Sequence, residues 1–167
     1  MIYQYLVQLF GTDILWAISL FLSPLIYHND TLSISTSMKQ PITPEIERLV
    51  QNGLKFRTEQ NLNIIINNQN SYNRSIDKTL IWDNGWFANG ISVGKKDLQN
   101  VMGITTYSFS NFSFSENDDI LIFIQSTILP DEEFTASTDL KTQVLWNFYS
   151  PSIRSEYVFR NGTFVKQ

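Results

Sequence analysis

A chain of 167 residues is long enough for one domain with a self-sufficient core, and its 43% hydrophobic and 17% charged residues exclude global disorder. The net charge of -4 is mild and dispersed, which argues against nucleic-acid binding. Cysteine is absent and His28 is the single histidine, so disulfides, thiolate metal sites and multi-histidine sites are excluded. We expect neither a metal site nor a cofactor.

The chain begins with an apolar head. Residues 14–27 carry no charge, and residues 2–27 together are long enough to cross a bilayer if Asp13 is accommodated. No Lys or Arg precedes this run, and no small-residue cleavage site is evident near Ser23. The pattern predicts a signal peptide or membrane anchor over residues 1–30, with an N-terminal helix packed in the domain as the alternative.

The domain proper, residues 31–167, is predicted to begin with a strand and a helix. Apolar residues alternate with polar ones over 31–38, which indicates a strand with one buried face. Residues 43–53 then carry helix signals at both ends, with Thr43 as N-cap, a proline and a glutamate in the first turn, and Gly53 at the C-terminus. This pattern predicts a short amphipathic helix that docks on a sheet.

The middle of the chain predicts a long strand and its hairpin partner. Residues 56–67 alternate between a core face and a polar face, and 76–82 is the expected partner strand. The polar residues 67–74 between them are predicted to form a hairpin loop of unusual length. Residues 83–85 give a further turn signal, and 95–102 a second short helix.

Two further strands are predicted before the chain reaches a proline. Residues 105–115 alternate, but the aromatic positions change phase across Ser110 and Asn111, so a β-bulge is expected there. Residues 118–130 are apolar at both alternating sets, which is typical of a central strand covered on both faces.

The end of the chain reads as a β-meander. Residues 131–138 form an acidic loop and 140–148 alternate as a strand. Residues 153–160 and 163–166 flank an Asn-Gly pair, a strong hairpin signal. The whole order predicts a mainly β or α+β protein, an antiparallel β-sandwich-like domain with one or two short covering helices.

Three aromatic side chains around a turn are the candidate partner-binding residues. Trp82, Trp86 and Phe87 could dock in a partner's groove or stack on sugars, and the alternative is that they pack against the core. We expect this turn, rather than the short terminal edge strand 163–166, to be the contact surface.

The acidic groups are weaker candidates. Asp118 and Asp119 lie at the opposite end of one strand from residues 131–133, so they are expected to be solvated strand ends rather than a calcium site. A carboxylate-based hydrolase acting on a carbohydrate, with Asp83 or Asp118 beside the tryptophans, is the enzyme alternative.

Two stretches carry a family resemblance. They are residues 32–66, LSISTSMKQPITPEIERLVQNGLKFRTEQNLNIII, and residues 97–130, DLQNVMGITTYSFSNFSFSENDDILIFIQSTILP, followed by LWNFYSP. In layout they resemble an exported bacterial family known as domain of unknown function 4390. The resemblance implies an extracytoplasmic location and a non-enzymatic role, and it brings no catalytic residue.

The sequence contains no nucleophile and base pair at a recognisable spacing. The favoured function is therefore a non-catalytic binding or envelope-assembly module. We expect it to be exported, either periplasmic or membrane-anchored through residues 2–27 and facing outward. Its expected partner is a protein of the cell envelope.

Overall fold

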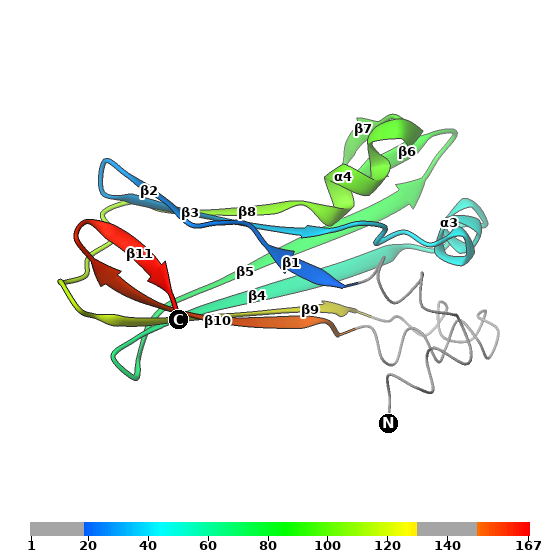
Figure 1. Ribbon diagram of the computed structural model, residues 1–167. Helices are drawn as coiled ribbons and strands as arrows, with labels where there is room; N and C mark the ends of the chain where they lie inside the picture. Colours follow the sequence, from blue (N-terminus) through cyan, green and yellow to red (C-terminus); the bar gives the residue numbers. More distant parts are fainter. Residues whose placement is uncertain (1–18, 130–149) are drawn as a thin grey trace, which may run out of the picture.

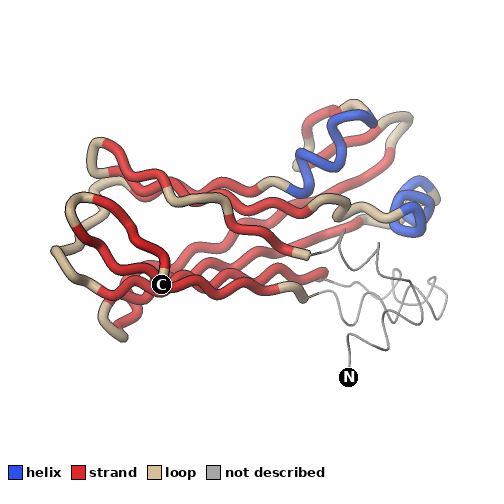
Figure 2. The backbone as a smooth tube through the Cα atoms, viewed as in Figure 1, coloured by secondary structure: helices blue, strands red, loops and turns tan. Residues whose placement is uncertain are grey.

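Two antiparallel sheets stacked face to face form the body of the protein (Figure 1), as the sequence predicts. The structure is a computed structural model that describes residues 19–129 and 150–167. In the smaller sheet the strands are β1 Leu20–Leu22, β2 Ile26–His28, β3 Thr31–Met38 and β8 Thr105–Phe109. In the larger sheet, in spatial order, they are β11 Thr163–Lys166, β10 Ser152–Arg160, β9 Asp119–Ile128, β4 Phe56–Ile66, β5 Gln69–Trp82, β6 Trp86–Ala88 and β7 Ile91–Val93. Figure 2 shows that the short helices of the described residues lie at one end of this β-rich body.

The smaller sheet is built around β3. Leu32 pairs with Phe109 of β8 on one side and with Tyr27 of β2 on the other, and β1 continues the β2 edge. Asn29 and Asp30 connect β2 to β3, and both have the positive φ of a tight hairpin turn. The region expected to belong to a signal peptide or anchor therefore supplies, from Leu20 onward, strands of the folded domain. Residues 1–18 lie outside the described residues.

The β4–β5 hairpin is longer than predicted. The strand over 56–67 is confirmed, but the long loop expected at 67–74 is wrong, because β5 already begins at Gln69. Asn67 and Asn68 alone make the turn, with φ of 50° and 65°. The polar residues that follow remain in a strand because β4 supplies the hydrogen-bonding partners for their backbone.

The predicted β-bulge after β8 is also wrong. The strand ends at Phe109, and Asn111 has a φ of 56°, which turns the chain away from the sheet. Phe112 is buried beyond that turn. The shift in the alternation of aromatic residues at Ser110 and Asn111 therefore marks the end of the strand. Beyond it, Phe112 packs against the core from a loop.

The expected central strand is confirmed as β9, which lies between β10 and β4. Its inward residues, among them Ile120, Ile122 and Ile124, are buried, whereas Leu121 and Phe123 on the outer face are only half-buried. The inner face of β9 is therefore fully buried, whereas its outer face is partly exposed. The terminal hairpin is confirmed, with its turn at 161–162, whereas the expected acidic loop 131–138 and strand 140–148 lie outside the described residues.

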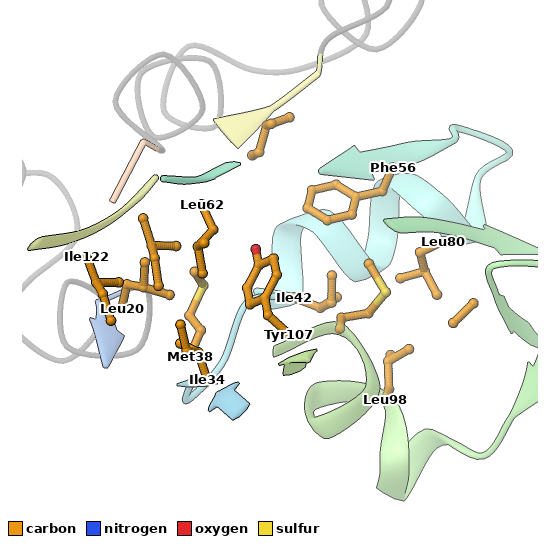
Figure 3. Packing of buried hydrophobic residues seen from close by; sticks show 14 of the residues in the cluster. Leu20, Ile34, Met38, Ile42, Phe56, Leu62, Leu80, Leu98, Tyr107 and Ile122 are labelled. Carbon is orange, nitrogen blue, oxygen red and sulfur yellow. The ribbon is translucent and has the colours of Figure 1, made fainter. Parts of the chain in front are cut away.

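The core fills the space between the two sheets (Figure 3). Ile34 of β3, Leu62 of β4 and Ile122 of β9 are completely buried there. A polar bridge crosses the same space: the Gln60 side-chain oxygen accepts hydrogen bonds from the Thr36 hydroxyl at 3.0 Å and the Tyr107 hydroxyl at 2.7 Å. Burial raises the pKa of Tyr107, so its hydroxyl stays protonated and donates this bond.

Both predicted helices are present. They are α3 Pro44–Gln51 and α4 Leu98–Gly103, the latter preceded by the 3-10 turn Lys95–Asp97. The Thr43 hydroxyl caps α3 by accepting from the Ile46 amide at 3.3 Å. Gln99 of α4 ties the two helical regions together, because its side chain donates to the Ile42 carbonyl at 2.8 Å and accepts from the Ile42 amide at 3.1 Å.

Candidate functional site

The aromatic turn predicted as a contact surface is mostly packed. Trp86 is 4% exposed and Phe87 is half-buried, whereas Trp82 is 37% exposed and meets Trp86 edge-on at a centroid distance of 5.0 Å. The structure therefore does not present these three rings as one exposed surface. This burial favours the packing alternative for Trp86 and leaves Trp82 as the accessible ring.

Asp118 lies far from the tryptophans. Ile66 pairs with Ile120 at the Asp118 end of β4, and Phe56 pairs with Leu80 at the other end. The ten steps between Phe56 and Ile66 cover roughly 33 Å. This separation exceeds the roughly 5 to 10 Å between the carboxyl groups of a glycosidase, so Asp118 cannot share one site with Asp83.

Asp118 instead holds two loops together. Its carboxylate accepts from the Asn67 side-chain amide at 2.9 Å and from the Ser115 backbone amide at 2.7 Å. These bonds, led by the one from Asn67, lower the pKa of Asp118. Within residues 19–129 and 150–167, no cluster of side chains suited to hold a metal ion is present.

The two long sides of the sandwich differ. On the side where β5 faces β8, the Arg74 guanidinium donates to the Ser108 carbonyl at 2.7 Å and lies 4.4 Å from the Phe109 ring centroid. Farther along, the Lys78 ammonium donates to the carbonyls of Val101 at 3.0 Å and Ile104 at 2.6 Å. Side chains from β5 thus close this side.

The opposite side is open. A groove of about 430 Å³ lies between the β1–β2 edge of the smaller sheet and the β10–β11 hairpin of the larger one. This volume falls in the range of roughly 300 to 1,000 Å³ that is usual for ligand sites. Figure 1 shows β2 and β11 beside each other at the same end of the sandwich. The groove is lined by Leu22, Ser23, Pro24, Leu25, Tyr27, Tyr157, Gly162, Thr163, Phe164 and Lys166.

Aromatic rings fix the shape of this groove. The Tyr27 ring meets Phe114 edge-on at 4.9 Å and Phe164 at 6.0 Å between centroids, and Phe164 in turn contacts Phe159 at 5.4 Å. The Tyr27 hydroxyl donates to the Asp30 carboxylate at 3.1 Å. Desolvation and this bond raise the pKa of Tyr27, so its hydroxyl remains a neutral donor at physiological pH.

Lys166 gives the groove its charge. Its side chain shares the inner face of the β10–β11 hairpin with that of Tyr157, because the two residues are paired in register. Among the described residues that line the groove it is the sole charged one, and neither described ion pair includes it. The site therefore combines apolar and aromatic walls with one free ammonium group.

Sequence reasoning missed this groove because its walls are far apart in the chain. Tyr27 lies in the run assigned to a membrane-associated head, and Phe164 lies in a hairpin whose edge was considered a weaker contact surface. The Asn29-Asp30 pair before an alternating segment was the available signal for a hairpin. It indicates that Tyr27 belongs to a strand.

Comparisons with protein families, curated proteins and solved structures found no match. The resemblance to domain of unknown function 4390 therefore stays a sequence-based hypothesis. None of the helices in the described part of the chain has the length and apolar character needed to span a bilayer.

Proposed function

We propose that this protein is a non-catalytic binding module that receives a segment of a protein partner in the groove between β1–β2 and β10–β11. The observation that carries the proposal is the contrast between the two sides of the sandwich. Side chains of β5 close one side, whereas the other side keeps a groove of about 430 Å³ with aromatic walls. Concave apolar surfaces with few polar groups are typical of binding sites.

We further propose that the protein works outside the cytoplasm, in assembly within the cell envelope. The apolar head and the cysteine-free, polar-faced strands support this location. Fractionation of cells that carry a C-terminally tagged chain tests it. Recovery of the tagged chain in soluble cytosol with an intact N-terminus would contradict the proposed location.

Site-specific photo-crosslinking tests the groove itself. A benzoylphenylalanine residue in place of Thr163 would lie at the groove, whereas the same residue in place of Ser92 on β7 would lie at the far edge of the larger sheet. Both positions are exposed, so neither replacement disturbs the core. In cells of the native host, we expect a covalent adduct of one defined mass from position 163 alone. Equal adducts from both positions, or no adduct from 163, would contradict the proposal.

A further inference from the structure

We propose that the partner segment binds as an extended strand that adds to β11, with apolar residues at alternate positions and an acidic side chain beside Lys166. This inference rests on the proposed function and specifies the chemistry of the partner. In the described part of the chain β11 is an edge of the larger sheet. An edge strand can accept a further strand through its free backbone groups.

The register shows which backbone groups are free. The Gln167 amide donates to the Glu156 carbonyl at 2.9 Å, and Val165 pairs with Val158 two residues earlier. In an antiparallel pair, residues that exchange hydrogen bonds alternate with residues whose N–H and C=O point away. Phe164 and Lys166 are therefore the residues whose backbone groups point toward the open edge. Their side chains face the groove. One ligand strand can therefore hydrogen-bond to the free backbone groups of β11 and also place its side chains in the groove.

The facing edge of the smaller sheet is less suited to strand addition. Strands β1 and β2 pair with β3 in registers that differ by one residue, so the edge bulges between them. Pro24 lies in this bulge and has no N–H to donate. Leu22, Leu25 and Tyr27 therefore serve as a wall for side chains, while β11 supplies the backbone ladder.

The charge of the groove specifies the ligand further. Lys166 is exposed, and no described residue pairs with it. A carboxylate beside this ammonium group complements the charge, whereas a second cation is repelled. An exposed pair of this kind contributes up to about fivefold in affinity. The apolar and aromatic walls favour apolar side chains at the alternate positions that face the groove.

A defined peptide tests the inference. The probe is the synthetic heptapeptide acetyl-Thr-Val-Thr-Glu-Thr-Val-Thr-amide, in which the two Val side chains and the Glu side chain share the face that is turned toward the groove and Lys166. It is compared with the same peptide carrying Lys in place of Glu. Amide hydrogen exchange is followed by NMR on the full 167-residue chain. At saturating Glu peptide, we expect the amides of Phe164 and Lys166 to exchange at least about tenfold more slowly, because both acquire partners. The Val165 amide, which already faces β10, should change less.

Two variants at one position separate the backbone from the charge. Lys166→Pro removes an outward N–H that forms no hydrogen bond in the described fold, whereas Lys166→Ala keeps this N–H and removes the charge. We expect the proline variant to lose at least about tenfold in peptide affinity, and the alanine variant to lose only the preference for Glu over Lys. An unchanged melting temperature shows that each variant is folded.

Several results would contradict strand addition to β11. Absence of peptide binding, protection of amides away from β11, or full affinity in Lys166→Pro would overturn strand addition. An adduct at position 163 that persists in cells carrying Lys166→Pro would keep the groove as the binding site and reject only the strand mode. If no adduct forms at position 163 in the protein that keeps Lys166, the proposed function itself is rejected.

Discussion

Raising the pH from 7 to 9.5 should stabilise this protein, because Lys78 is buried between the layers. The residue is 8% exposed, and desolvation lowers the pKa of its ammonium group from 10.5 to about 8. Above pH 8 the folded state carries a neutral amine at this position while the unfolded chain still binds the proton. The unfolded state therefore binds more protons, and the free energy of unfolding rises with pH.

The size of the effect follows from the two pKa values. Between pH 7 and pH 9.5 the gain is at most about 2 kcal/mol, since each pKa unit corresponds to about 1.4 kcal/mol. Above pH 10 the trend reverses, because Tyr107 ionises more readily in the unfolded chain than in its buried position. The stabilising window therefore lies between the lowered pKa of Lys78 and the ordinary pKa of tyrosine.

Urea unfolding at pH 7 and pH 9.5 measures this gain. With a slope of about 2 kcal/mol/M, the midpoint of the parent protein should rise by about 1 M. The matched control is Lys78→Met, which keeps the length of the side chain and removes the titrating group. A parent midpoint that does not rise, or an equal rise in Lys78→Met, would refute the assignment to this amine.

Four further substitutions test the core, with Trp82→Ala as the control for Trp86→Ala. In urea unfolding, Trp86→Ala should lower the free energy of unfolding by about 3 to 5 kcal/mol and Trp82→Ala by less than about 2 kcal/mol, because Trp86 is buried and Trp82 is partly exposed. Equal losses in the two variants would contradict this difference in packing. Gly103→Ala should lower the free energy of unfolding by about 1 to 3 kcal/mol, because an added Cβ would lie 2.4 Å from the Met38 carbonyl oxygen. An unchanged melting temperature would show that the backbone near Met38 moves to accept the methyl group. Tyr107→Phe should cost about 1 to 2 kcal/mol through its bond to Gln60, and a neutral result would mean that the bond contributes nothing net.

Periodicity predicted the fold class because most strands bury one face. The even-numbered residues of β3 are buried in strict alternation, and β4 follows the same rule through Thr58 and Gln60. The sequence did not predict the length of a strand where that length depends on pairing with a neighbouring strand. Residues 69–75 are mostly polar on both faces, so only the β4 backbone reveals that they form a strand.

The candidate site was less predictable than the fold. A short apolar run is compatible with a membrane segment and with a β-strand, so residues 20–28 could not be assigned from composition alone. Burial of Trp86 depends on the chain turning back at 83–85 so that its ring faces inward. The groove requires Tyr27 and Phe164 to meet across two sheets, and no local pattern encodes that contact.

The strand order of the larger sheet has a consequence for biosynthesis. Strand β4 lies between β5, which follows it directly, and β9, which begins only at Asp119. A growing chain therefore completes the β4–β5 hairpin long before the second neighbour of β4 exists. During that interval a long strand with an apolar face has an unpaired edge, the form in which chains associate with one another. Ribosome-released fragments that end before Asp119 should accordingly aggregate, while chains that extend past Lys166 should remain dispersed.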